Sequence, residues 1–155
     1  MSLEIERKFL VNREKWAGVK PQRSVRMKQG YLLSDGVKTL RVRVAGDQGF
    51  ITIKGRTKGL SRPEFEYEVP VSEAEELLKL FAGELVEKKR HYVQHGDHLW
   101  EVDEFSGKNE GLLMAEVELD SEEEEFEKPE WLGTEVTTDK RYSNASLAAK
   151  PFSEW

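Results

Sequence analysis

The sequence contains no cysteine and no long apolar run. The lack of cysteine excludes disulfide bonds, thiolate nucleophiles and zinc-thiolate sites, and it fits a reducing compartment. No segment approaches the roughly 18 apolar residues that a membrane-spanning helix needs. The first residues, MSLEIERKFL, also lack the apolar core of a signal peptide. We therefore expect a cytoplasmic protein without a membrane partner.

Positive charge is in deficit, since 24 Lys and Arg residues face 30 Asp and Glu residues and the formal net charge is −6. Phosphate backbones are normally bound by a basic patch, so the balance predicts no nucleic-acid partner. Charged residues make up 35% of the chain, but four Trp, four Tyr and seven Phe argue against disorder. The 155 residues are expected to fold as one domain spanning 1–155.

Most of the chain alternates apolar and charged residues with a period of two, which is typical of half-buried strands. Turn residues separate these segments at hairpin spacing, which favours antiparallel pairing. Three helices are also expected: one from a Ser72–Glu75 capping box to Gly83, an acidic one from Ser121, and one from Asp139 towards Pro151. The pattern predicts an α+β domain with strands at residues 3–11, 29–33, 40–45, 50–54, 65–69, 85–93, 99–105 and 112–119.

The polar faces of these strands carry doublets of one charge sign. Like charges two residues apart repel unless an opposite charge, a metal or a ligand lies against them. An open sheet with a solvated face would explain one doublet, but six doublets sorted by sign favour a closed eight-stranded antiparallel β-barrel with a charged lumen and helices outside. The lumen positions are Glu4, Glu6, Lys8, Arg41, Arg43, Lys54, Glu64, Glu66, Lys88, Arg90, Glu101, Asp103, Glu116 and Glu118.

Two kinds of ligand chemistry would meet in such a lumen. Carboxylate clusters bind hard divalent cations, and Mg²⁺ or Mn²⁺ suits a site shared with phosphate oxygens. Arg and Lys bind phosphate oxygens, Arg in bidentate fashion. The sequence therefore predicts a binding site for a metal-complexed polyphosphate.

The segment Glu4-Ile5-Glu6-Arg7-Lys8 resembles the ExExK signature of the CYTH superfamily, also called triphosphate tunnel metalloenzymes. The resemblance implies a closed β-tunnel that binds a linear triphosphate and one or two divalent metal ions. By its length the chain is similar to the compact bacterial members. The match continues in order through Gln29-Gly30-Tyr31-Leu32, Arg41-x-Arg43, Lys54, Glu64-x-Glu66, Lys88-x-Arg90, Asp103, Glu116-x-Glu118 and Asp139-Lys140-Arg141-Tyr142.

The resemblance also implies roles for individual side chains. The implied metal ligands are Glu4, Glu6, Asp103, Glu116 and Glu118, and the implied triphosphate ligands are Arg41, Arg43, Lys54, Lys88, Arg90 and Lys140. Lys8 with Tyr31 resembles the pair proposed to activate the attacking water. Glu64, Glu66 and Glu101 are expected behind the direct ligands or around this water. A base at Lys8 needs a pKa far below about 10.4, and phosphate binding by Lys8 is the alternative.

The expected activity is metal-dependent hydrolysis of a small triphosphate, with inorganic tripolyphosphate cleaved to pyrophosphate and orthophosphate. A class IV-type adenylate cyclase, a thiamine triphosphatase and a noncatalytic polyphosphate- or nucleotide-binding module are the alternatives. The noncatalytic binding module is the weaker hypothesis, because a carboxylate cluster without metal would repel a phosphate ligand. A homodimer is compatible with the sequence.

Other polar features have plainer interpretations. His91, His95 and His98 lack the spacing of a metal site, and Ser24, Ser34 and Ser106 show no nearby catalytic partners in the sequence. The acidic run 122–125 is expected to be a solvated helix face, and the basic segment 55–62 a hairpin loop rather than a lid.

Overall fold

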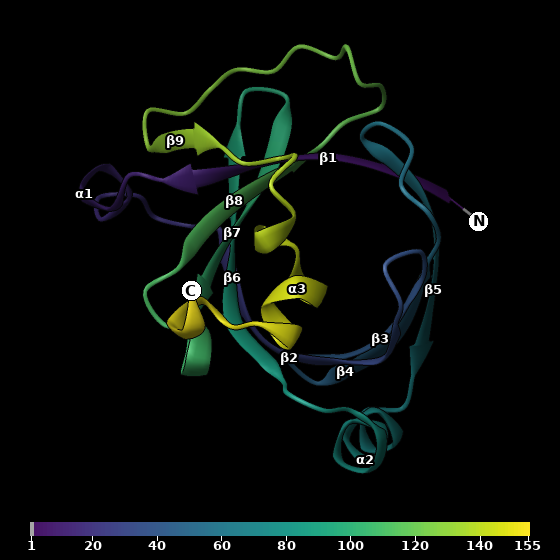
Figure 1. Cartoon of the computed structure of the whole chain (residues 1–155). Coiled ribbons are helices and arrows are strands. Elements are labelled where there is room, and N and C mark those ends of the chain that lie inside the picture. Colours follow the sequence, from purple (N-terminus) through teal and green to yellow (C-terminus); the bar gives the residue numbers. More distant parts are fainter. Residues whose placement is uncertain (1) are drawn as a thin grey trace.

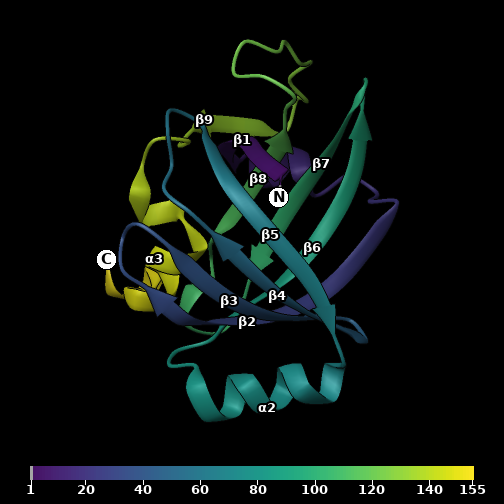
Figure 2. The ribbon, with the colours of Figure 1, turned by 90° about the vertical axis from the view of Figure 1, so that its right-hand side faces the viewer.

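The computed structural model describes residues 2–155, in which nine strands form one continuous antiparallel sheet. Because β5 pairs with both β4 and β1, the first eight strands close into a barrel in the order β5-β4-β3-β2-β6-β7-β8-β1 (Figures 1 and 2). The predicted closed eight-stranded barrel is thereby confirmed. The strands are β1 (Ser2–Val11), β2 (Arg23–Ser34), β3 (Thr39–Ala45), β4 (Gln48–Lys54), β5 (Ser61–Val69), β6 (Val86–His95), β7 (His98–Phe105), β8 (Leu113–Glu118) and β9 (Leu132–Glu135).

The short strand β9 was not predicted and lies outside the closed ring. It pairs with β1 across a register shift between Phe9 and Val11. Only four residues long, it lacks the extended alternation by which the other strands are recognised. This pairing brings the C-terminal segment back to the barrel.

The helices occupy two different places around the barrel. Helix α2 (Val71–Phe81) packs on the outer face of β3 and β4, whereas α3 (Asn144–Ala149) lies across the barrel opening in the view of Figure 1. The remaining helices are short: α1 (Arg13–Trp16), η1 (Gly107–Asn109), η2 (Lys140–Tyr142) and η3 (Phe152–Glu154). Among residues 2–155, no helix is both long and apolar enough to cross a membrane.

Two helix boundaries differ from the prediction. Pro70, not Ser72, precedes α2, no side chain caps its first turn, and the helix ends at Phe81. Asp139 caps the short 3₁₀ turn η2 by accepting the N–H of Arg141, and α3 begins only after Ser143, whose hydroxyl accepts the N–H of Ser146. The predicted third helix is therefore two shorter helices, each with its own cap.

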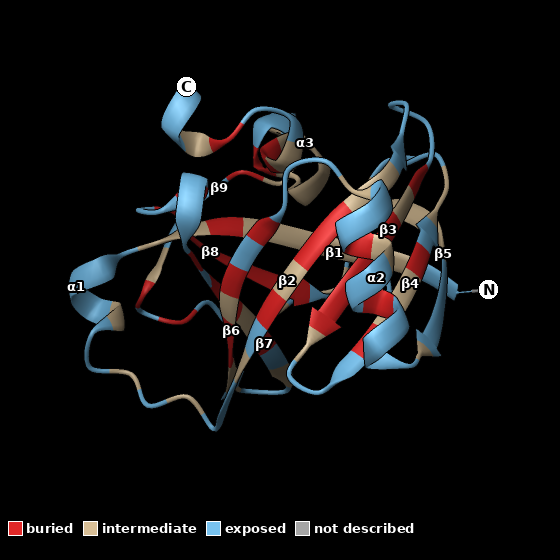
Figure 3. Cartoon of the chain, turned by 90° about the horizontal axis from the view of Figure 1, so that it is seen from below, coloured by how far each residue is buried: buried red, intermediate tan, exposed pale blue. Residues whose placement is uncertain are grey.

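The outer face of the sheet is apolar where it is covered. Leu78 and Ala74 of α2 are buried against Val42 and Val44 of β3. A Cβ at Gly30 would stand 2.7 Å from the Cβ of Ala82, so the glycine lets the end of α2 approach β2 closely. Red positions alternate with paler ones along the strands in Figure 3. Packing on this outer face leaves the polar face of each strand for the lumen.

The acidic helix predicted from Ser121 does not form. A turn at residues 122–123 is followed by an irregular segment up to residue 129. Glu124 accepts the N–H of Asp120 (2.6 Å) and contacts Nε2 of His98 (2.5 Å), while Phe126 packs edge-on against Phe9 and Trp100. These tertiary contacts outweigh the local helix preference.

Candidate active site in the tunnel

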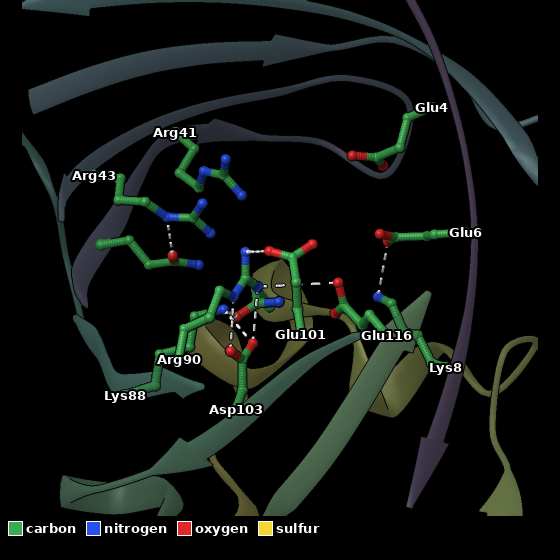
Figure 4. A network of polar contacts seen from close by, with 12 residues as sticks. Glu4, Glu6, Lys8, Arg41, Arg43, Lys88, Arg90, Glu101, Asp103 and Glu116 are labelled. Atoms are coloured by element: carbon green, nitrogen blue, oxygen red, sulfur yellow. Dashed lines mark hydrogen bonds and ion pairs between the residues drawn. The ribbon is translucent and has the colours of Figure 1, made fainter. Parts of the chain in front are cut away.

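The barrel encloses a cavity of about 710 Å³ that is lined by the charged strand faces. Alternate residues of a strand point to the same face, and closure turns that face inwards. Figure 4 shows Glu4 and Glu6 of β1 across the lumen from Arg41 and Arg43 of β3, and Arg90 of β6 beside Glu101 and Asp103 of β7. The predicted residues that line the cavity are Glu4, Glu6, Lys8, Tyr31, Arg41, Arg43, Lys54, Glu64, Glu66, Arg90, Glu101, Glu116, Glu118 and Lys140.

One side of the lumen, here called the acidic wall, consists of Glu6 on β1 and Glu116 and Glu118 on β8. Glu6 is the register partner of Glu118, and Glu101 on β7 is the partner of Glu116. Carboxylates directly opposite each other destabilise a sheet unless a cation lies between them. Burial and the charge of Glu116 raise the pKa of Glu6 to about 8, and burial with Glu4 and Glu101 raises that of Glu118.

The acidic wall has the donor chemistry of a Mg²⁺ or Mn²⁺ site. Its ligands are all carboxylate oxygens, which hard divalent cations prefer, and their mutual repulsion is what a cation would relieve. Among residues 2–155, no three His, Asp or Glu side chains are already gathered in metal-binding geometry. The donor set fits the metal, and cation binding would draw the carboxylates together.

Glu4 differs from its neighbours on the acidic side because it has a lysine partner. Lys54 Nζ lies 2.8 Å from Glu4 Oε2 and 3.5 Å from Glu64 Oε2. Burial alone would raise the pKa of Glu4, but Lys54 outweighs it and lowers the pKa to about 2. Burial and the nearby Glu4 raise the pKa of Glu64 to about 7. The carboxylates of Glu4 and Glu64 thus compete for the ammonium group of Lys54.

Lys8 lies among carboxylates, with Nζ 3.7 Å from Glu6 Oε1. Burial would lower its pKa, but Glu116, Glu6 and Glu4 together raise it. The lowered pKa that a neutral lysine base needs is therefore not found in this structure. Tyr31, the other member of the predicted pair, lines the same cavity.

The β6 wall, defined as Lys88 and Arg90, meets carboxylates from β7. Asp103 accepts Arg90 Nε at 2.8 Å on Oδ1, and both Arg90 Nη2 at 2.9 Å and Lys88 Nζ at 2.7 Å on Oδ2. Glu101 accepts Arg90 Nη1 at 2.6 Å. Burial would raise the pKa of Asp103, but Arg90 and Lys88 hold it well below its usual range.

Two predicted ligands lie behind the lining of the cavity rather than on it. Asp103, predicted to bind metal, is 1% exposed, and Lys88, predicted to bind phosphate, is 3% exposed. Neither lines the cavity. Both oxygens of Asp103 are occupied by Arg90 and Lys88, and Lys88 also donates to Asn144 Oδ1 at 3.1 Å. Strand alternation assigned both residues to the inner face of the sheet, but their ion pair with each other holds them below the surface of the cavity.

The β3 wall, defined as Arg41 and Arg43, meets mainly neutral groups. Arg41 donates to the hydroxyl of Thr52 at 3.2 Å, and its nearest carboxylate oxygen, on Glu66, is 3.9 Å away. Arg43 donates from Nε to Gln29 Oε1 at 2.7 Å and has no ion-pair partner within 4.0 Å in the part of the chain described. Burial, with the charges of Arg41 and Arg90, lowers the pKa of Arg43 to about 9.

Several cavity features escaped the sequence-based prediction. Ser143 and Asn144 line the cavity at the start of α3, and Thr57, Gly59 and Leu60 of the predicted hairpin loop also reach it. A strand pattern does not indicate which end of a barrel a C-terminal segment will cover. Gln29, which contacts Arg43 but does not line the cavity, was named only as part of the family pattern and given no role, although alternation puts it on the same face as Tyr31.

A serine and a histidine outside the tunnel also meet, although the sequence showed no partners for them. Ser24 Oγ lies 2.7 Å from His91 Nδ1, and His91 Nε2 lies 3.2 Å from Glu104 Oε1. The two strands β2 and β6 place Ser24 directly opposite His91. None of the three residues lines the cavity.

The closed antiparallel barrel with acidic and basic sides to its lumen defines a charged β-tunnel protein. Comparison with known sequences assigns the family, since the CYTH domain pattern matches residues 2–152. The chain belongs to the CYTH domain family, as the ExExK resemblance predicted.

Two relatives of this chain and one similar crystal structure are named inorganic triphosphatase. It is 45% identical over 153 residues to an inorganic triphosphatase from Acetivibrio thermocellus, covering 98% of this chain and 97% of the relative. It is 41% identical over 150 residues to an inorganic triphosphatase from Nitrosomonas europaea, covering 94% and 96%. A crystal structure of an inorganic triphosphatase shares 38% identity with a TM-score of 0.66, covering 96% and 95% of the two chains.

Proposed function

We propose that this chain is an inorganic triphosphatase that uses Mg²⁺ or Mn²⁺ to cleave tripolyphosphate into pyrophosphate and orthophosphate. The observation that carries the proposal is that one lumen holds a cluster of carboxylates that outnumbers its neighbouring Lys8 and, across from it, the arginines of β3, which are held mainly by neutral groups. A linear triphosphate with a divalent cation complements both sides. The proposal is supported by two relatives at 45% and 41% identity that are named for this activity and are covered almost completely.

The basic side of the tunnel would hold and orient the phosphate chain. Arg41, Arg43 and Arg90 line the cavity together, and Lys54 and Lys140 add ammonium groups. Phosphoryl transfer depends mostly on positioning and on electrostatic stabilisation of charge on phosphate oxygens. In our revised assignment Lys88 and Asp103 do not touch substrate, and they fix Arg90 from behind.

The acidic wall would hold the metal ion, with Glu4 contributing when Lys54 turns to phosphate. A bound divalent cation would neutralise charge that develops on the phosphate oxygens. Water would then attack the terminal phosphorus and give up a proton to solvent as the new O–P bond forms, while the bridging P–O bond breaks and pyrophosphate leaves. Lys8 and Tyr31 lie where they could orient this water, and the raised pKa of Lys8 suits donation to an oxygen better than proton removal.

The direct test offers tripolyphosphate, ATP and thiamine triphosphate to the purified protein with Mg²⁺, with Mn²⁺ or with a chelator. We expect orthophosphate from tripolyphosphate and its loss with the chelator. Cyclic AMP from ATP would instead identify an adenylate cyclase, preferential cleavage of thiamine triphosphate would identify a thiamine triphosphatase, and binding without turnover would identify a noncatalytic module.

Glu6→Gln tests the acidic wall at residue level. The substitution preserves shape but removes a proposed metal ligand, so kcat for tripolyphosphate should fall by at least about 100-fold. The melting temperature of the metal-free chain should not fall, because a carboxyl with a pKa of about 8 is already largely protonated near neutral pH and glutamine is its neutral isostere. Glu68→Gln, an exposed glutamate on β5 outside the cavity lining, is the matched control and should leave kcat unchanged. Full activity of Glu6→Gln would refute the metal assignment.

We also propose that the chain forms a homodimer and works in the cytoplasm. The dimer is supported by an uncovered apolar strip on the outside of the barrel, where Leu3, Ile53, Phe65 and Tyr67 are each at least 37% exposed. Sedimentation equilibrium would measure the mass, and a monomer at micromolar concentration would reject the dimer.

The cytoplasmic location is supported by the lack of cysteine and is tested by cell fractionation.

A further inference from the structure

Gln29 on β2 is a fully buried polar residue without a role in the proposed reaction. It is 0% exposed and stands directly opposite Arg43 in the β2–β3 register. Its Oε1 accepts Nε of Arg43 at 2.7 Å, while its Nε2 is buried with no hydrogen-bond partner among residues 2–155. An amide that leaves a donor unsatisfied costs stability, so its presence beneath Arg43 calls for a reason.

The surroundings of Arg43 explain why its partner is neutral. Arg90 is paired with Asp103 and Glu101, Lys54 with Glu4, and Arg41 lies 3.9 Å from Glu66. Arg43 has no carboxylate within ion-pair distance in the described chain. An amide oxygen can fix the plane of a guanidinium group by accepting from Nε while leaving its positive charge uncancelled.

Resting on the proposed function, we propose that Gln29 is a positioning residue that orients Arg43 for substrate phosphate while keeping its charge free. A glutamate has the same shape and would hold Arg43 equally well. It would also form a buried ion pair with Arg43, and the phosphate chain would then have to compete with a fixed internal anion. The neutral amide thus sacrifices some stability of the folded chain and preserves affinity for an anion.

This inference predicts that stability and affinity separate in Gln29→Glu. The new carboxylate meets Arg43 and adds a negative charge beside a cluster of three arginines, so the melting temperature should stay the same or rise. The KM for tripolyphosphate should rise by about 10- to 100-fold, with a smaller change in kcat, because a binding charge is cancelled.

Gln29→Met is the companion variant, since it keeps the volume and leaves Arg43 charged but removes the acceptor. Its melting temperature should fall, because Nε of Arg43 loses its buried partner. Its KM should rise by only about two- to fivefold, because Arg43 loses the hydrogen bond that orients it but keeps the positive charge that binds phosphate. Gln94→Glu, which adds the same charge at an exposed residue of β6 outside the cavity, should leave both quantities unchanged.

The experiment measures KM, kcat and melting temperature for the wild-type chain and the three variants. A KM for Gln29→Glu within twofold of wild type, or a melting temperature below that of Gln29→Met, overturns the inference. A wild-type chain that does not cleave tripolyphosphate overturns the proposed function instead. In that case calorimetric binding of tripolyphosphate by wild type and Gln29→Glu still decides the role of Gln29: equal affinities reject it, and weaker binding by the variant supports it.

Discussion

On β6, Arg90 and Lys88 are bound by carboxylates of the neighbouring strand, whereas on β3, Arg41 and Arg43 are held mainly by a hydroxyl and an amide. The β6 wall is therefore neutralised within the protein, and its geometry is set before any ligand arrives. The β3 wall keeps its charge at the expense of repulsion between Arg41, Arg43 and Arg90. The charge of the β6 wall is thus balanced before a ligand binds, whereas that of the β3 wall is left to attract one.

The acidic wall extends this comparison to negative charge. Glu4 is paired with Lys54, as Arg90 is with Asp103, whereas Glu6 lies opposite Glu118 with Lys8 3.7 Å away, and Arg43 lies two residues from Arg41 on the same strand. The lumen thus contains one region with an excess of negative charge and one with an excess of positive charge. A metal ion and a phosphate chain would relieve both together, which explains why a triphosphate with its cation suits the tunnel better than either alone.

The largest effect is expected from breaking the β6 wall with Asp103→Asn. Removing the carboxylate leaves Arg90 and Lys88 buried without the anion that they share, which costs about 3–5 kcal/mol of unfolding free energy. Urea denaturation would measure it. The control is Asp47→Asn, at an exposed turn between β3 and β4, which should cost far less. A loss below about 1 kcal/mol at Asp103 would show that the β6 wall does not depend on its carboxylate.

Breaking the β3 wall with Arg43→Met should affect binding instead of folding. The KM for tripolyphosphate should rise by about 10- to 100-fold, since hydrogen bonds to charged groups contribute about 1.5–3 kcal/mol. The unfolding free energy should change little, because the lost contact with Gln29 is offset by relief of repulsion with Arg41 and Arg90. Steady-state kinetics and urea denaturation measure the two quantities.

Arg26→Met is the matched control for Arg43→Met. Arg26 is an exposed arginine of β2 outside the cavity lining, so its loss changes the net charge equally. Its KM should match wild type. If both variants raised KM alike, the effect of Arg43 would be one of overall charge and not of its place on the β3 wall.

The sequence predicted the face of each strand better than the depth of each side chain. Alternation assigns Lys88 and Asp103 to the lumen, but only the paired strands show that they bind each other and leave the cavity surface to Arg90. The sorting of charges by sign from strand to strand predicted that the barrel closes, because a strand face exposed to solvent has no need of such sorting. The acidic helix from Ser121 was wrong because Phe126 and Glu124 have tertiary partners that a local pattern does not contain.

Neutral residues were the other gap in the prediction. The argument from charge doublets finds Arg43 but passes over Gln29, although the two are directly opposite in register. Whether a cation is neutralised depends on which residue its neighbouring strand places beside it. That information lies in strand pairing, so the division between the β3 wall and the β6 wall could not be predicted from one strand at a time.

Acid provides the most graded way to test the division between the two walls. The pKa of Asp103 is far below its unfolded value of about 3.9, so above that value the carboxylate is ionised in both states and its stabilisation is complete. Below it, the unfolded chain binds one proton more than the folded chain, and the contribution of Asp103 falls by about 1.4 kcal/mol per pH unit. The difference in unfolding free energy between wild type and Asp103→Asn should therefore shrink by about 1 kcal/mol between pH 4 and pH 3, where the unfolded carboxylate is still being protonated, as measured by urea denaturation at several pH values. The corresponding difference for Arg43→Met should stay constant over the same interval, since the pKa of Arg43 is about 9 and its partner is an amide that does not titrate. Equal slopes for the two variants would mean that the β3 wall also depends on a carboxylate, and the contrast between a neutralised and an uncompensated wall would fail.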